Sequence, residues 1–361
     1  MDALGEKGRE DMGVDPGLDL VGDQPMQVMK RPIPGYQYEY GKPPTSEFLN
    51  SISFYDEIEA VWGRQWGAQS KIGTLRYALV ARPTENEVSA EAAYDPLFYD
   101  YPNGPPDLAK MRSEFDAFEA VLKNEGVELE YINIPNVLHG PYVRFRCLWP
   151  SASAFVVNGG AIVPRYGGFV FRKGHEVLLA KKLMELGCPI LMTIRGRGVG
   201  ELGGNGIWLD PKHIILGVGP SLNMEAVRQV EPFLREAGAE EIHIGYFTDA
   251  IHLDMVFSLV DAWLAVVDRR RIDHETIRYL RRKNIRWLEV PPEESDAGVC
   301  NMLALAPAKV VMPTGCPITR KALEAEGVQI IELDFTEYNK GGGGPHCIVG
   351  ALIRDSGPML P

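Results

Sequence analysis

A leucine stands four residues before a glycine or asparagine at five places, and this repeat constrains the fold more than any other feature of the chain. The pairs are Leu122 with Gly126, Leu183 with Gly187, Leu234 with Gly238, Leu280 with Asn284, and Leu323 with Gly327. Glycine or asparagine just past a helix supplies the left-handed residue that ends it. A strand-like apolar run follows each pair, at residues 127–134, 189–193, 241–246, 285–290 and 328–333. The pattern therefore predicts five helix-to-strand units.

Two short apolar runs separated by a turn precede four of these helices. They span 154–157 with 161–164, 206–209 with 213–218, 255–259 with 263–267, and 302–305 with 309–312. The first unit shows only one such run clearly, at residues 75–81. Turn residues such as Asn158-Gly159-Gly160 fit hairpin connections. The predicted unit is thus strand–strand–helix–strand, and five of them would stack or close on themselves and bring distant loops to one end.

Residues before this repeat are predicted to form a separate region, 1–70, ahead of a catalytic domain at 71–361. Residues 1–45 carry Pro, Gly and charge with little periodicity and are expected to be an arm. Residues 46–66 are expected to be a helix with Ser46 as its cap. Three large aromatics there, Tyr55, Trp62 and Trp66, lie outside the repeat. We expect them to pack against the main domain or a neighbouring subunit, which favours a homo-oligomer.

Composition excludes several classes of partner. The net charge is −12 and no Lys/Arg cluster interrupts it, which argues against nucleic acid or an anionic membrane as partner. No apolar run approaches the roughly 20 residues needed to span a bilayer. The five cysteines are sparse and never form CxxC, which favours reduced thiols in the cytoplasm over disulfides or a zinc site. A small-molecule substrate is the expected partner.

The run of four glycines at 341–344, followed by Pro345, His346 and Cys347, is hard to explain as core packing. Glycine buries no side chain, but it lets the backbone come close to a ligand. We interpret Cys347 as a nucleophilic thiol; the alternative is a flexible loop with an incidental cysteine. A thiol needs activation, because a free cysteine with a pKa of about 8.5 is mostly protonated at neutral pH.

His252 and Asp254 are the residues expected to supply that activation. Alternate residues of a strand face the same side, so both side chains are predicted to project together. An imidazole beside a carboxylate is a general acid/base with an orienting group. The alternative is a surface His–Asp pair at a strand end. His346 is expected to point away from Cys347 on an extended segment, so His252 is preferred.

Residues 200–206 again place glycines around polar groups, here Glu201 and Asn205. We expect close backbone approach to a small substrate, with Asn205 as a hydrogen-bonding group; a tight turn is the alternative. Arg195 and Arg197 could hold a substrate carboxylate, although a solvated loop explains them equally well. The other cysteines, at positions 147, 188, 300 and 316, lack a glycine-bracketed setting and are expected to be packing residues.

Three segments in this order resemble a known superfamily. HLDMVFSLVD (252–261), CNMLALAP (300–307) and GGGGPHC (341–347), with five ββαβ units, resemble the guanidino-modifying enzymes. These are the arginine deiminases, dimethylarginine hydrolases and amidinotransferases. The resemblance implies the pentein fold, a pseudo-fivefold α/β-propeller. It also implies that Cys347 attacks an sp² carbon bearing nitrogen, His252 acts as acid/base, and Asp254 holds substrate N–H groups, without a metal or organic cofactor.

Two departures from the family pattern bear on the substrate. The second-unit aspartate that grips a guanidinium falls at Ala152, and its neighbouring arginine at Ser151. The family's Glu-Gly-Gly-Asp, anchored on the glycines, puts Leu202 at the glutamate position and Asn205 at the aspartate position. Glu201 can replace the glutamate only if a bulge shifts the register.

Losing charged partners costs about 1.5–3 kcal/mol apiece, so a site of this kind suits a neutral ring better than a guanidinium. The chain is similar in kind to the branch of the superfamily that hydrolyses 2-nitroimidazole with release of nitrite. The alternatives are a deiminase, dimethylarginine hydrolase or amidinotransferase with Glu201 on the guanidinium, and a catalytically dead pentein that only binds.

Overall fold

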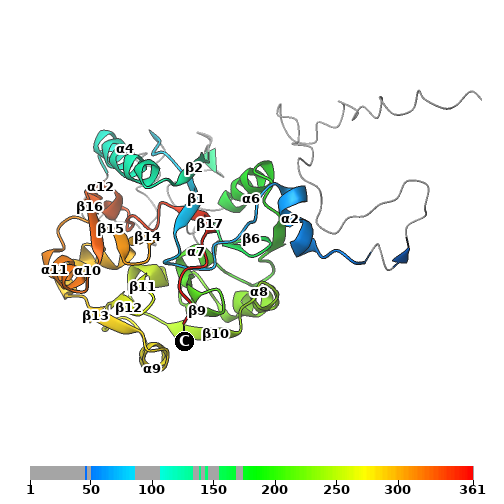
Figure 1. Cartoon of the computed structure of the whole chain (residues 1–361). Coiled ribbons are helices and arrows are strands. Elements are labelled where there is room, and N and C mark those ends of the chain that lie inside the picture. Colours follow the sequence, from blue (N-terminus) through cyan, green and yellow to red (C-terminus); the bar gives the residue numbers. More distant parts are fainter. Residues whose placement is uncertain are drawn as a thin grey trace, which may run out of the picture. The chain divides into compact units, whose positions relative to one another are not determined.

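The described chain contains five three-stranded sheets, four of them built from one predicted unit each and the fifth completed by the C-terminal strand (Figure 1). The computed structural model describes residues 45, 46, 50–85, 106–132, 138, 139, 143, 144, 154–167 and 174–360. By its contacts the chain forms two units, residues 1–64 and 65–361. Figure 1 shows helices α4, α6, α8, α9 and α11 at the periphery of the larger unit, with the sheets toward its centre.

The first strand of each sheet pairs antiparallel with the second, and the second pairs parallel with the strand that follows the helix. The complete units are β5 (Val156–Val157), β6 (Gly160–Val163), α6 (His175–Glu185) and β7 (Ile190–Thr193); β8 (Gly206–Asp210), β9 (His213–Val218), α8 (Met224–Glu236) and β10 (Glu241–Tyr246); β11 (Phe257–Asp261), β12 (Leu264–Val267), α9 (His274–Arg282) and β13 (Arg286–Glu289); and β14 (Leu303–Ala306), β15 (Lys309–Pro313), α11 (Pro317–Ala325) and β16 (Gln329–Leu333).

The C-terminal strand supplies the piece that the first unit lacks in sequence. This unit contains β1 (Leu75–Val80), α4 (Leu108–Asn124) and β2 (Glu128–Tyr131), and β17 (Gly350–Arg354) pairs antiparallel with β1. The first and last strands of the larger unit therefore share one sheet. This is why the sequence shows only one clear run before the first helix.

All five predicted helix stops are confirmed. Gly126, Gly187, Gly238, Asn284 and Gly327 have φ between 56° and 114°. The leucine four residues earlier is fully buried in every case. Its carbonyl accepts a hydrogen bond from the amide five residues onward, at 2.8–3.0 Å. The same motif thus buries a leucine in the core and ends each helix so that the chain turns toward the next strand.

Short helical segments fill the connections between these elements. They are α7 (Leu202–Asn205), the 3₁₀ turns η3 (Leu253–Met255) and η4 (Val299–Asn301), α10 (Pro292–Asp296) and α12 (Thr336–Lys340). A two-stranded sheet joins β3 (Leu138–His139) to β4 (Val143–Arg144). No helix in the described ranges is long and apolar enough to cross a membrane.

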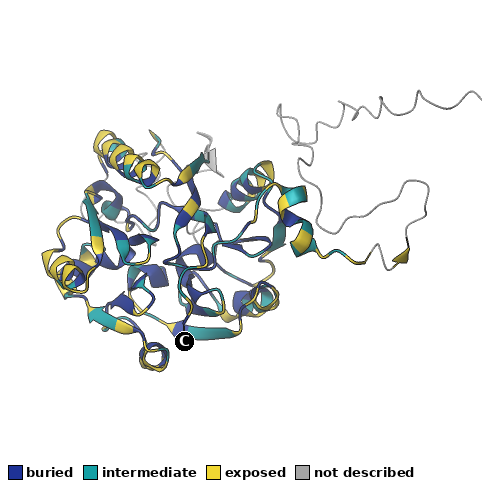
Figure 2. Cartoon of the chain, viewed as in Figure 1, coloured by how far each residue is buried: buried dark blue, intermediate teal, exposed yellow. Residues whose placement is uncertain are grey.

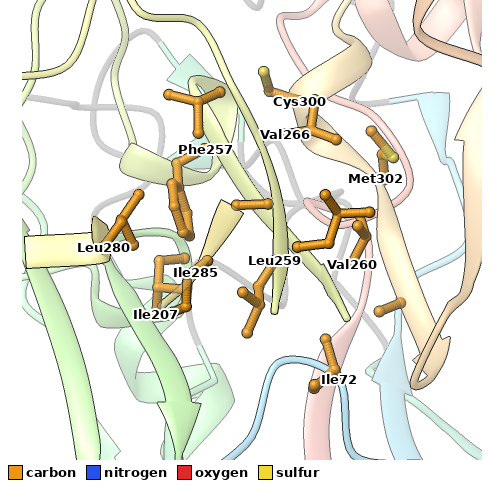
Figure 3. Close-up of a cluster of buried hydrophobic side chains, with 14 of the residues drawn as sticks. Ile72, Ile207, Phe257, Leu259, Val260, Val266, Leu280, Ile285, Cys300 and Met302 are labelled. Atoms are coloured by element: carbon orange, nitrogen blue, oxygen red, sulfur yellow. The ribbon is translucent and has the colours of Figure 1, made fainter. Parts of the chain in front are cut away.

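Apolar side chains from neighbouring sheets meet in shared clusters. The largest cluster contains Ile207 from β8, Phe257 from β11, Leu280 from α9 and Met302 next to β14 (Figure 3). It therefore joins three successive units. Figure 2 shows buried positions on the strands and exposed ones on the outer faces of α4, α9 and α11. Packing across sheets therefore holds the connections before their first strands in fixed positions.

The smaller unit contains helix α2 (Phe54–Trp62), and the prediction of one helix over 46–66 is wrong. Residues 50–53 are not helical. Ser53, rather than Ser46, caps α2, because it accepts a bond from the Asp56 amide while the Asp56 carboxylate accepts from the Ser53 amide. Trp66 belongs to the larger unit, where its ring lies 6.0 Å from that of Tyr77.

Candidate active site

The candidate residues occupy equivalent places in different units, directly before the first strand of a sheet. Glu201 and Asn205 lie at α7 before β8, and His252 and Asp254 lie at η3 before β11. Cys347 lies just before β17. Residues separated by up to 146 positions are thereby brought to one buried region.

Cys347 is held by Asn301, the last residue of η4. The Asn301 amide donates from Nδ2 to Sγ at 3.0 Å, while its Oδ1 accepts from the Cys347 backbone amide at 3.1 Å. Gly344 makes this approach possible, because a Cβ there would lie 3.2 Å from Asn301 Oδ1. The glycine run thus brings the loop against Asn301. An N–H donor on sulfur favours the thiolate over the thiol.

Asp254 connects the sulfur to a second chain of polar groups. Its Oδ2 lies 3.8 Å from Cys347 Sγ and accepts from His346 Nδ1 at 2.7 Å. On the other side of the imidazole, Lys71 Nζ lies 3.0 Å from Nε2 and also donates to the Gly203 carbonyl. A lysine ammonium only donates, so His346 accepts at Nε2 and carries its proton on Nδ1.

Charge and burial explain how these groups are ionised. Burial lowers the pKa of His346 to about 4, so its ring is neutral near pH 7. Burial also lowers the pKa of Lys71, to about 8, against the opposing attraction of Asp254. Burial raises the pKa of Asp254, but the hydrogen bond from His346 and nearby positive charge outweigh it, so the net shift is downward. Asp254 is therefore a carboxylate beside a protonated lysine.

The predicted pairing of His252 with Asp254 on one strand is wrong. These residues belong to a 3₁₀ turn, in which His252 is the extended N-cap residue and Asp254 lies inside the turn. The turn sends the side chains to different partners, Asp254 to His346 and His252 to Glu201. His346 does not point away from the site, because it bonds the carboxylate that Cys347 contacts.

Glu201, not Leu202, faces His252. The Glu201 Oε2 atom lies 3.0 Å from His252 Nε2, and both side chains are buried. Leu202 instead packs in an apolar cluster with Trp208 and Phe155. The one-turn helix α7 produces this arrangement, because it shifts the register that the glycine-anchored alignment assumed. Gly204 adds room, since a Cβ there would lie 2.7 Å from the His252 ring.

Asn205 ties two units together and is fully buried. Its Nδ2 donates to the Glu201 carbonyl at 2.9 Å and to Ser221 Oγ at 2.8 Å, while its Oδ1 accepts from the Leu253 amide at 3.1 Å. These bonds use both amide protons. The arrangement makes Asn205 a positioning residue between α7 and η3, and its contact with a substrate stays a prediction.

The remaining predicted groups lie elsewhere. Arg195 and Arg197 are exposed. Cys188, Cys300 and Cys316 are buried, and burial raises the pKa of Cys300 and of Cys316 to about 12, so these thiols stay protonated and serve as packing residues. Cys147, Ser151 and Ala152 lie outside the described residues. Within the described chain, no group of three or more His, Cys, Asp or Glu is arranged to hold a metal.

Sequence reasoning missed Lys71 and Asn301, and it underrated His346. Asn301 had a signal, because it lies in the segment 300–307 at the start of a unit, as Asn205 does. Lys71 had none, because it precedes β1 at a position with no pattern of its own. Only the closed arrangement of the sheets brings it to His346.

Comparisons with known proteins agree with this architecture. The arginine deiminase profile matches residues 269–354. The 2-nitroimidazole nitrohydrolase of Mycobacterium sp. strain JS330 is 26% identical over 344 residues, covering 88% of this chain and 90% of that protein. The dimethylarginine dimethylaminohydrolase of Pseudomonas aeruginosa is 24% identical over 251 residues, covering 68% and 89%.

Solved structures show the same fold. The amidinotransferase SxtG from Microseira wollei superposes with a TM-score of 0.68 at 16% identity, covering 82% of this chain and 99% of that one. The Pseudomonas aeruginosa dimethylarginine dimethylaminohydrolase in complex with citrulline gives 0.61 at 20% identity, covering 78% and 100%. The chain therefore has the pentein fold. Like these structural neighbours, it combines helices with five small sheets.

Proposed function

We propose that this pentein is a cysteine-dependent hydrolase that attacks an sp² carbon flanked by nitrogens, and that its substrate is a small neutral heterocycle such as 2-nitroimidazole. In this proposal the five sheets form a pseudo-fivefold α/β-propeller, and Cys347, His252, Glu201 and Asp254 meet at its catalytic end. The family-level chemistry is that of hydrolases acting on C–N bonds, to which several relatives belong.

The observation that carries the substrate class is the charge balance around Asp254. A guanidinium stays protonated and needs carboxylate partners in a buried site. Here Asp254 already accepts from His346 and lies in the field of Lys71, while Glu201 bonds His252. Lys71 would repel the positive charge of a bound guanidinium, whereas it would not repel a neutral ring. Asp254 Oδ1, which is buried with no hydrogen-bond partner among the described residues, can accept a ring N–H.

The proposed reaction has two displacements at one carbon. The Cys347 thiolate, stabilised by the Asn301 amide and the charge of Lys71, adds to C2 of the ring. Nitrite leaves with the electron pair of the C–N bond, and an S-imidazolyl intermediate remains. Water then adds to C2, the thiolate leaves, and imidazolone is released. One water is consumed, and its two protons are shared between imidazolone and nitrous acid.

His252 is proposed to donate and accept the protons in these two steps. The Glu201 carboxylate at Nε2 fixes the orientation of the ring, which is the function of the acidic partner in an acid/base pair. His252 gives a proton to the departing or ring nitrogen in the first step and takes one from water in the second. No metal or organic cofactor enters either step.

Product analysis tests the substrate class. Full-length protein is incubated with 2-nitroimidazole, arginine and dimethylarginine, and nitrite, ammonia and citrulline are measured. The proposal expects nitrite without citrulline, loss of turnover in Cys347→Ser, and normal turnover in Cys316→Ser as the matched buried-thiol control. Citrulline formation without nitrite would overturn the neutral-ring substrate.

A guanidino substrate is the second candidate, and one observation favours it. Glu201 lies in the site where the alignment had placed Leu202, so the carboxylate that a deiminase uses is present. Mass spectrometry separates the candidates, because an S-imidazolyl adduct and an S-amidino adduct on Cys347 differ in mass. Retention of turnover by Cys347→Ser would contradict both, whereas no turnover of any of these substrates by the wild type would favour a pentein that only binds.

A further inference from the structure

A small cavity lies behind Lys71 and His346, and its wall is rich in hydrogen-bond donors. It measures about 30 Å³ and is lined by Ser70, Lys71, Trp208, His346 and Arg354 together with apolar residues. None of the described residues that line it carries a carboxylate. Since a single water needs roughly 10–15 Å³, one small group fits with space to spare.

Ser70, Trp208 and Lys71 on this wall each have a donor left over, whereas both ring nitrogens of His346 already have partners. Ser70 Oγ accepts from two backbone amides, Ile72 and Gly73, so its hydroxyl proton remains to be donated. Trp208 is 1% exposed, and its Nε1–H has no acceptor among the described residues. The ammonium of Lys71 uses two of its three protons, on His346 and Gly203.

Arg354 adds a charge that the described chain does not neutralise. Arg354 is 8% exposed, and its Nη1 donates to the Gly73 carbonyl at 2.7 Å. No ion pair to Arg354 occurs within the described residues. Burial lowers the pKa of Arg354 to about 10, and its charge in turn lowers the pKa of Lys71. Both cations therefore act on the same small volume.

The unpaired charge of Arg354 sets the charge of the ligand. Lys71 has Asp254 nearby, on the far side of the His346 ring, whereas Arg354 bonds only a neutral carbonyl among the described residues. A buried unpaired charge is costly unless a counter-charge accompanies it. Water is a weaker match, because it brings two protons of its own to a wall that already offers donors.

We propose that this cavity is a binding site for one small inorganic monoanion of about the size of chloride. The ligand accepts from Arg354, Lys71, Trp208 and Ser70. Its negative charge keeps Lys71 protonated, which in turn holds His346 in the Nδ1–H form that donates to Asp254. That consequence for the catalytic groups rests on the proposed function, whereas anion binding itself does not.

Thermal unfolding of the full-length protein tests anion binding without any substrate. The melting temperature is measured at constant ionic strength while sodium gluconate is replaced by sodium chloride or bromide. A ligand that binds only the folded state raises it with a saturable dependence on concentration. We expect a rise of a few degrees in the wild type, a much smaller one in Trp208→Phe, and none in Arg354→Met.

Arg76→Met is the matched control, because Arg76 is a half-exposed arginine on the adjacent strand β1, paired with Asp355. It should respond to chloride as the wild type does. Trp208→Phe keeps an aromatic ring beside Phe155 while it removes the N–H together with part of the indole ring, so it gives a second, uncharged test if Arg354→Met fails to fold.

Crystals grown in sodium bromide provide a direct measurement. An anomalous peak within hydrogen-bonding distance of Arg354 and Lys71 is expected. Equal melting temperatures in chloride and gluconate, an undiminished response in Trp208→Phe, or density for water alone in the cavity would each overturn the proposal. Because none of these readouts involves turnover, they separate failure of this site from failure of the proposed reaction.

Discussion

Replacing Asn301 by aspartate is the sharpest test of how this site would generate a thiolate. Aspartate has the shape of asparagine and retains an oxygen to accept from the Cys347 amide. It replaces the Nδ2 donor, 3.0 Å from Sγ, with a second carboxylate oxygen. The backbone contacts of the loop are preserved while the electrostatics at the sulfur reverse.

The magnitude follows from Coulomb's law. Two negative charges 3.0 Å apart repel by about 1.4 kcal/mol in bulk water and about 5.5 kcal/mol at an effective dielectric constant of 20. Losing the donor adds roughly 1.5–3 kcal/mol. At 1.36 kcal/mol per pH unit, the pH midpoint of thiolate reactivity should rise by at least one unit. The thiolate population at pH 7 should then fall at least tenfold.

The assay is the rate of alkylation by iodoacetamide as a function of pH, with Cys347 followed by peptide mass spectrometry. It needs no knowledge of the substrate. Asn301→Ala is the matched control, because it removes the donor without adding charge and should shift the midpoint less than Asn301→Asp. Identical midpoints in Asn301→Asp and the wild type, with both proteins folded by circular dichroism, would refute the reasoning.

Three further predictions concern stability and geometry. Between pH 4 and 6.5, His346 binds fewer protons in the folded protein than in the unfolded chain, so the free energy of unfolding should decrease as the pH falls through that window. Chemical denaturation of His346→Gln should show a weaker decrease over the same pH range. An unchanged decrease would contradict the buried neutral imidazole. Gly204→Ala puts a Cβ 2.7 Å from the His252 ring and should cut kcat at least tenfold while Tm changes by only a few degrees; wild-type kcat would refute the close packing. Asn284→Gly should stabilise by a few tenths to about 1 kcal/mol, because Asn284 has φ 56°, and a lower midpoint in urea would count against the capping argument.

The amino-acid sequence by itself determined the units of this fold. Three features depend on local sequence alone: where helices end, which leucines are buried and how strand residues alternate. The five pairs of a leucine and a helix-ending residue therefore predict the units without reference to the rest of the chain. The predicted strands accordingly match the observed ones to within a few residues, as residues 241–246 and β10 do. The same locality made Cys347, His252, Asp254 and Glu201 recognisable as candidates.

Tertiary structure decided which of these residues bond to which. Whether Glu201 or Leu202 faces His252 depends on a single helical turn, and no periodicity in 200–206 predicts it. The partnership of Asp254 with His346 and Lys71 joins residues 92 and 275 positions apart along two successive bonds, so it exists only once β17 has closed on β1. Burial then sets the charges: the same lysine in water would keep its ordinary pKa, and exclusion from solvent, aided by the charge of Arg354 and opposed by Asp254, lowers it to about 8.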